Sequence, residues 1–197
     1  LDESDRKRVD YFTQQIVDML APTNFLATNP DALEQAVATN GESLVLGLEN
    51  LVKDLEANDG EMVVSLADAE AFEVGRNLGT TKGSVVFRNR MFELIQYAPT
   101  TETVHETPLL IFPPWINKFY VLDLKEKNSL IEWVVDQGYT LFVVSWVNPD
   151  ESYAGVGMDQ YVEEGYLTAI DQVKKITGVE KINVTGYCIA GTTLSIT

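Results

Sequence analysis

The stretch that decides the fold is Gly186-Tyr187-Cys188-Ile189-Ala190-Gly191-Thr192, in which small residues surround the one cysteine of the chain. It follows the run 182–185, which predicts a strand, and it opens a segment typical of a helix. A sharp turn from strand to helix needs small residues because backbone atoms approach one another closely there. Gly186, Ala190 and Gly191 leave that space, and the turn would expose Cys188. The pattern is that of a nucleophile elbow, which usually reads Gly-x-Ser-x-Gly.

Upstream of this turn, apolar runs alternate with helical segments. Residues 109–112 and 140–146 are too apolar to alternate, as is typical of strands buried on both faces. A helix is predicted over 128–137, ended by Gly138, and a second over 159–177, ended by Gly178. The side chains of the first helix expected to face inward are Leu130, Ile131, Val134 and Val135. This order of elements predicts a parallel sheet with crossover helices.

Two further parts precede that sheet. Residues 84–88 and 91–97 read as a pair of antiparallel strands. Before them, Asn29-Pro30 marks the start of one helix, and the amphipathic run 44–55 predicts another, expected to pack against its own domain. We therefore predict an α/β protein with a helical N-terminal segment over 1–78 and a partial core over 79–197 that ends just after the elbow.

This layout is that of the first half of an α/β-hydrolase, in which an oxyanion hole takes two backbone N–H groups. One donor is the residue after the nucleophile, here Ile189. The other comes from the loop after an earlier strand, here 113–117. Its two prolines have no N–H to donate, so Trp115, Ile116 or Asn117 must supply it, and we favour Ile116.

Cys188 has two readings. A cysteine is often a small buried hydrophobic residue, but a position between a strand and a helix favours a nucleophile, since the N–H groups of a helix N-terminus favour a thiolate. A general base is missing. The one histidine, His105, precedes the 109–112 strand and reads as a surface loop residue, whereas catalytic groups gather at the carboxyl ends of such strands. The acid and base are expected beyond Thr197, so this chain alone is expected to be inactive.

Composition narrows the classes of function. The chain has 30 acidic and 14 basic residues and a net charge of -16, which argues against binding nucleic acid. A single cysteine without a His/Cys cluster predicts no disulfide within the chain, no metal site and a cytoplasmic location. No apolar run reaches the roughly 20 residues of a membrane helix, and no signal peptide is recognisable. The missing initial methionine suggests a piece of a longer protein.

Four motifs stand out along the chain. They are Glu73-Val74-Gly75-Arg76-Asn77, residues 113–124, Ser145-Trp146-Val147-Asn148-Pro149-Asp150, and residues 186–192. These motifs resemble those of the polyhydroxyalkanoate synthases, and the likeness runs through most of the chain. It is strongest to class I, which has short-chain substrates and a single type of subunit. In this family an elbow cysteine usually stands before a glycine where this chain has Ala190, and a downstream Asp and His activate it.

The resemblance implies a function for the parent protein. It would polymerise (R)-3-hydroxyacyl-CoA, with 3-hydroxybutyryl-CoA as the expected substrate, and release CoA while Cys188 carries the growing polyester chain. The CoA thioester is then a substrate, and no cofactor is expected. The likeness further implies a homodimer in the cytoplasm, at the surface of storage-polymer granules. Two alternatives stay open, a thioesterase or polyester hydrolase of the same fold, and a non-catalytic interaction module.

Overall fold

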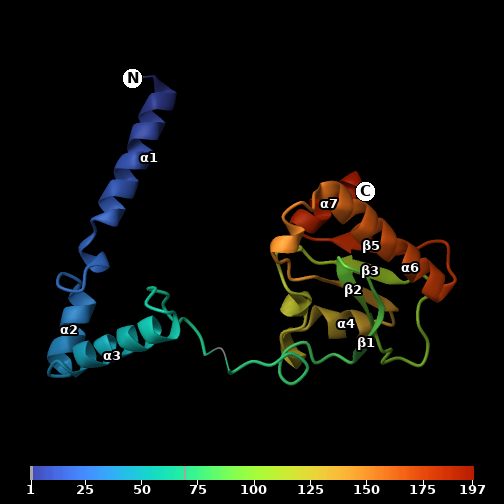
Figure 1. Cartoon of the computed structure of the whole chain (residues 1–197), viewed down its shortest axis with the longest axis horizontal. Coiled ribbons are helices and arrows are strands. Elements are labelled where there is room, and N and C mark those ends of the chain that lie inside the picture. The colour runs from blue at the N-terminus through green and yellow to red at the C-terminus, as the bar shows by residue number, and fades with distance from the viewer. Residues whose placement is uncertain (1, 69) are drawn as a thin grey trace. The chain divides into compact units, whose positions relative to one another are not determined.

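A computed structural model describes residues 2–68 and 70–197 and divides the chain into two compact units, residues 1–68 and 69–197 (Figure 1). The first unit consists of helices, and the second combines a sheet with helices. The predicted mixed α/β class is therefore confirmed. The boundary expected after residue 78 falls inside the second unit.

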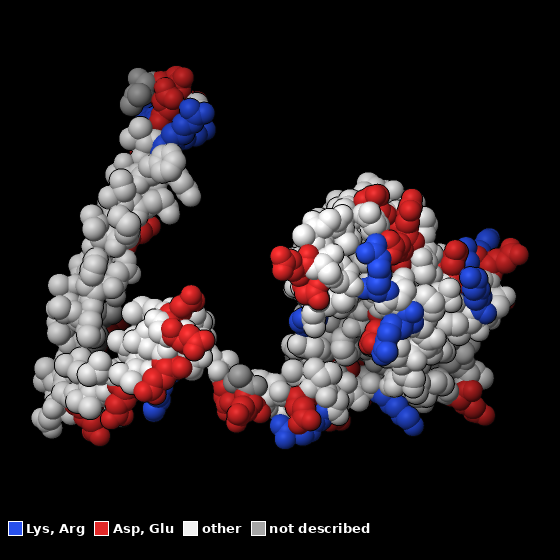
Figure 2. Space-filling view, in the orientation of Figure 1, with Lys and Arg blue, Asp and Glu red and all other residues white. Residues whose placement is uncertain are grey.

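The first unit contains α1 (Glu3–Met19), the short 3₁₀ turn η1 (Pro22–Asn24), α2 (Pro30–Ala38) and α3 (Glu42–Ala57). The Asn29 side chain accepts hydrogen bonds from the N–H groups of Asp31 and Ala32, so α2 begins where the sequence predicts. The predicted amphipathic helix is α3, and acidic side chains cover part of its surface (Figure 2). It contacts α2, yet Leu44, Leu48 and Val52 stay exposed instead of packing as expected.

The second unit contains a five-stranded sheet in the order β1-β2-β4-β3-β5. β1 pairs antiparallel with β2, and β2 pairs antiparallel with β4. β3 lies parallel to both β4 and β5. The predicted strands, the antiparallel pair and the parallel core are all confirmed. The bounds are β1 Gly83–Arg88, β2 Phe92–Tyr97, β3 Leu109–Phe112, β4 Leu141–Trp146 and β5 Asn183–Gly186.

Helices cover both faces of this sheet, because side chains along each strand alternate between them. On one face, α4 (Leu130–Asp136) buries Ile131, Val134 and Val135 against β3 and β4. α6 (Thr168–Thr177) and α7 (Ile189–Ile196) cover the other face (Figure 1). The inward position predicted for Leu130 was wrong. It opens α4 and is 46% exposed, because the apolar stripe begins one residue later.

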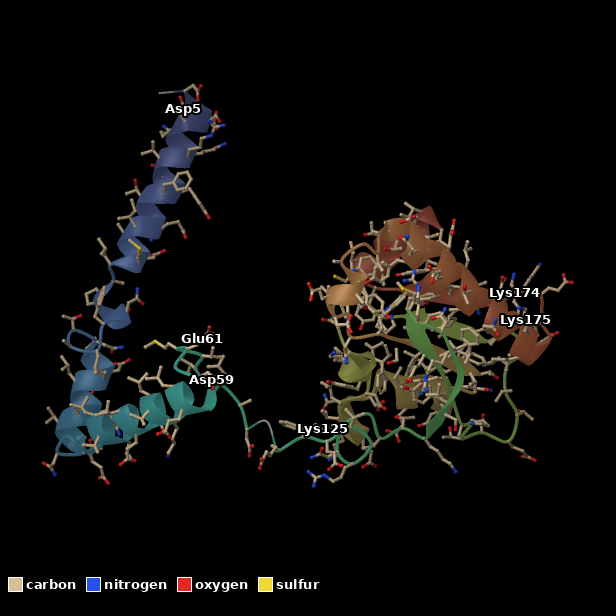
Figure 3. All side chains as sticks on the ribbon, in the orientation of Figure 1. Asp5, Asp59, Glu61, Lys125, Lys174 and Lys175 are labelled. Carbon is tan, nitrogen blue, oxygen red and sulfur yellow. The ribbon has the colours of Figure 1, made fainter. Side chains whose placement is uncertain are left out.

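The crossover helix predicted over 159–177 has three pieces, α5 (Met158–Gln160), the π-helix η5 (Tyr161–Leu167) and α6. It ends at Gly178 in a left-handed conformation, as expected. Lys174 and Lys175 lie in its last turn (Figure 3). Their positive charges interact favourably with the carbonyl groups that have no partner at the end of the helix. Short 3₁₀ turns complete the unit, at Phe119–Leu122 (η2), Glu126–Asn128 (η3) and Glu151–Tyr153 (η4). None of the described helices is long and apolar enough to cross a membrane.

Candidate active site at the carboxyl edge of the sheet

Cys188 lies between β5 and α7, as the N-cap residue of that helix. Its backbone has φ 55° and ψ -135°, a combination that residues with a Cβ rarely adopt and that costs conformational energy. Such strain is found where a surrounding structure holds a side chain in a required direction. The thiol-bearing residue is exposed. Strand, strained turn and helix together have the geometry of a nucleophile elbow.

Two glycines allow this turn because the backbone approaches itself closely. A Cβ on Gly186 would lie 2.7 Å from the carbonyl oxygen of Ala190. A Cβ on Gly191 would lie 2.9 Å from the carbonyl oxygen of Gly186. Both separations are shorter than any real contact of a Cβ atom, so neither position admits a side chain without movement of the backbone. Ala190 is fully buried between them.

The loop after β3 leaves the sheet beside the elbow. Phe112 of β3 is in register with Gly186 of β5, and neighbouring strands are about 4.8 Å apart. In the loop, the N–H of Asn117 donates to the carbonyl oxygen of Pro114 at 3.0 Å. That bond occupies Asn117, which leaves Trp115 and Ile116 of the three candidate donors. Ile189 is the first residue of α7, where an N–H group has no acceptor within its helix.

A cavity of about 450 Å³ lies at the same edge, between the loops that follow β3 and β4. Three aromatic rings form part of its wall, with the ring centroids of Trp115 and Tyr161 4.8 Å apart. Lys118 Nζ donates to Asn148 Oδ1 and joins the two loops. The structure thus brings together two motifs that are separate in the sequence. The cavity is lined by Trp115, Ile116, Asn117, Lys118, Trp146, Val147, Asn148, Pro149 and Tyr161.

His105 lies away from this edge. His105 is exposed, and the centroid of its ring is 4.6 Å from that of the Tyr139 ring. The backbone N–H of His105 donates to the carbonyl oxygen of Gly138 at 2.8 Å. These partners precede β4, at the amino end of the parallel strands. Within residues 2–68 and 70–197, the Cys188 thiol has no hydrogen-bonding partner, and no group of three or more His, Cys, Asp or Glu could hold a metal. The described part of the site therefore holds an exposed thiol with no basic side chain hydrogen-bonded to it.

One hydrogen bond to the elbow could not be expected from the sequence. The hydroxyl of Tyr166, in η5, donates to the carbonyl oxygen of Ala190 at 3.1 Å. The Tyr166 ring stacks on Phe112 at 4.1 Å, with 16° between the ring planes. A tyrosine inside a predicted helix reads as an ordinary core residue, so no signal in the sequence pointed to it.

Comparison with known proteins bears on the same region. A family model described as "Poly-beta-hydroxybutyrate polymerase (PhaC) N-terminus" matches residues 1–134, more than half of the chain. The chain belongs to this family. The match covers the first unit and the second as far as α4, so the PhaC family assignment stands independently of the elbow.

Relatives of the PhaC family extend the likeness through Cys188. The chain is 47% identical over 197 residues to a poly(3-hydroxyalkanoate) polymerase of Methylorubrum extorquens, covering 100% of this chain and 33% of the relative. It is 47% identical over 194 residues to the polymerase subunit PhaC of Cupriavidus necator, covering 98% and 32%. For a polymerase of Ectopseudomonas oleovorans the identity is 42% over 195 residues, covering 99% and 34%. The chain thus spans about a third of the length of these relatives.

Proposed function

We propose that the whole protein polymerises (R)-3-hydroxyacyl-CoA into polyhydroxyalkanoate and releases CoA, with Cys188 as the acyl carrier. The observation that carries this proposal is the exposed Cys188 at a strained turn between β5 and α7. Relatives that bear the name of this polymerase align with the whole of the chain. A thiol suits the reaction because exchanging one thioester for another has little energetic cost.

The second unit supplies the first half of an α/β-hydrolase core in this proposal. Support comes from the parallel strands β3, β4 and β5, the helices on both faces of the sheet, and the elbow after β5. In this fold the acid and base follow the nucleophile along the chain. An Asp and a His that activate Cys188 are therefore assigned to the part of the whole protein that follows residue 197.

The chemistry follows from these positions. The Cys188 thiolate attacks the thioester carbonyl carbon, and the oxygen of the tetrahedral intermediate accepts hydrogen bonds from the N–H groups of Ile189 and Ile116. Collapse breaks the bond to the CoA sulfur, which leaves as the thiol after taking a proton from the base. The hydroxyl of the next hydroxyacyl-CoA then attacks the carbonyl carbon of the enzyme-bound thioester and gives its proton to the base. Collapse forms the ester and breaks the bond to the Cys188 sulfur, which leaves as the thiolate, so that the lengthened chain ends in a CoA thioester that can react with Cys188 again. No cofactor takes part in either step.

The setting of the protein is part of the same proposal. Partners are the hydroxyacyl-CoA, the growing polyester and a second copy of the whole protein, in the cytoplasm at the surface of polymer granules. Nucleic acid is not among them, in keeping with the net charge of -16.

The test is polymer synthesis by the whole protein from 3-hydroxybutyryl-CoA. We expect CoA release together with polyester, and a loss of at least about 10³-fold in rate for Cys188→Ala, because removal of a covalent nucleophile has effects of this size or larger. Ser65→Ala is the control, since this exposed side chain lies in the first unit and its hydroxyl makes no hydrogen bond within the described ranges, so the rate should stay unchanged. The release of free CoA can be followed with a thiol reagent. The polymer can be quantified by methanolysis and gas chromatography.

Two results would replace the proposal with an alternative. CoA release that yields only the free hydroxy acid would identify a thioesterase or polyester hydrolase. Unchanged polymerisation by Cys188→Ala would remove the nucleophile assignment and favour a non-catalytic interaction module.

A further inference from the structure

Tyr166 links the crossover helix to the elbow through a hydrogen bond made by its buried side chain. Its side chain is fully buried, with 0% exposure, and it lies in the cluster that includes Phe112 and Ala190. A tyrosine hydroxyl is protonated at neutral pH and can donate, and burial raises the pKa of this one further, to about 12. The acceptor is the carbonyl oxygen of Ala190, 3.1 Å away, in the first turn of α7.

That acceptor is also the atom that sets the tightness of the turn. The carbonyl oxygen of Ala190 lies 2.7 Å from the position of a Cβ on Gly186. A displacement of this carbonyl by a few tenths of an ångström would change the contact between β5 and α7. The hydroxyl of Thr193, fully buried in the same helix, donates to the carbonyl oxygen of Ile189 at 3.0 Å and adds a second side-chain hydrogen bond to this turn.

The position of the π-helix η5 on the sheet determines which atoms the Tyr166 side chain can contact. A Cβ on Gly165 would lie 2.8 Å from the Trp146 ring, so the glycine lets η5 lie directly on β4. Asn89 donates to the carbonyl oxygen of Glu164 at 2.7 Å, and Thr168 donates to that of Glu163 at 2.9 Å. Such side-chain donors satisfy carbonyl groups that a widened helix leaves without regular partners. Tyr166 is therefore held from both sides of its helix.

We propose that Tyr166 is a positioning residue for the reaction, because its hydroxyl fixes the first turn of α7 and with it the direction of the Ile189 N–H. This inference rests on the proposed function, in which that N–H stabilises the oxyanion. The bond acts on the transition state and not on substrate binding, since Tyr166 is buried under the elbow and contacts no open surface.

The experiment compares Tyr166→Phe with Tyr97→Phe in the whole protein. Tyr97 is a matched control, since it also has a buried hydroxyl but lies on the opposite face of the sheet, and this hydroxyl has no hydrogen-bond partner among the described residues. For Tyr166→Phe we expect kcat to fall about tenfold with KM within about twofold of the parent, because a misplaced donor weakens only the transition state. Tyr97→Phe should leave both constants unchanged.

A second measurement does not depend on catalysis. Hydrogen exchange of the α7 amides in the whole protein should become about five- to tenfold faster in Tyr166→Phe and stay the same in Tyr97→Phe, since the lost bond is worth about 1 kcal/mol. An unchanged kcat in folded Tyr166→Phe, or exchange in α7 that does not respond, overturns the inference. If the parent makes no polymer while the exchange difference is present, the proposed function fails and the structural contact stands.

Discussion

Cys188 shows how much of a site one residue can reveal. Its role could be proposed from the sequence because the neighbouring positions must be small for reasons of close contact, and Gly186 and Gly191 meet that demand. Tyr166 could not be found in this way. Its acceptor lies on another element, 24 residues further along the chain, and only the packed structure brings the two together.

Gly186→Ala is predicted to destabilise the second unit by about 1–3 kcal/mol, the usual cost of overpacking. The added Cβ would lie 2.7 Å from the carbonyl oxygen of Ala190, so β5 or α7 must shift. The free energy of unfolding in urea, followed by tryptophan fluorescence, measures the change. Gly155→Ala is the control, because its Cβ would meet no atom within 4 Å, and its effect should stay within about 0.5 kcal/mol.

At the scale of elements, β3 and β4 could be predicted from the sequence because strands buried on both faces are continuous apolar runs. The π-helix could not be predicted, since the widened turns depend on the fit of Gly165 against Trp146 and on donors from the β1–β2 turn. The same turn adds an ion pair to η5. Arg90 Nε donates to Glu164 Oε2 at 2.6 Å, and Nη2 contacts the other carboxylate oxygen.

This ion pair predicts a pH-dependent contribution to stability. The hydrogen bond from Arg90 lowers the pKa of Glu164, so the folded state holds the carboxylate more strongly than the unfolded chain does. The resulting stabilisation is present above the unfolded pKa of about 4.3 and is lost as the pH falls through the lower folded pKa. The stability difference between the parent and Glu164→Gln, from urea unfolding, should therefore be larger at pH 7 than at acidic pH.

The control for this prediction is Glu106→Gln. Glu106 is exposed and forms no ion pair with any residue in the described ranges, so its replacement should give a difference that does not vary with pH in this way. A Glu164→Gln difference that grows on acidification would contradict the assigned direction. Added salt should also reduce the difference at pH 7, since both side chains are partly exposed.

At the scale of the whole molecule, the two units differ in whether they contain buried residues. The described buried residues all lie between Met91 and Thr193, and none belongs to α1, α2 or α3. The sequence indicated a helical first part and an α/β second part, because the apolar period changes between them. The boundary expected after residue 78 stays a prediction. The compact units divide after residue 68, and the irregular stretch between α3 and β1 offers no periodic signal from which a boundary could be placed.

Removal of residues 1–68 is predicted to change the free energy of unfolding of the second unit by less than about 1 kcal/mol, because every described buried residue lies within residues 69–197. Urea unfolding reports this directly, since Trp115, Trp133 and Trp146, the three tryptophans of the chain, all lie in the second unit. The intact chain is the reference. A loss above about 2 kcal/mol would show that the first unit stabilises the second.

The exposed Cys188 also has a consequence for redox chemistry. Oxidation of a thiol to a sulfenic acid is normally reversed when a second thiol in the same protein closes a disulfide. This chain contains one cysteine and so has no resolving partner of its own. Within residues 1–197, an oxidised Cys188 therefore has no second thiol with which to close a disulfide, and it proceeds to sulfinic and sulfonic acids unless a thiol from outside these residues reacts with it.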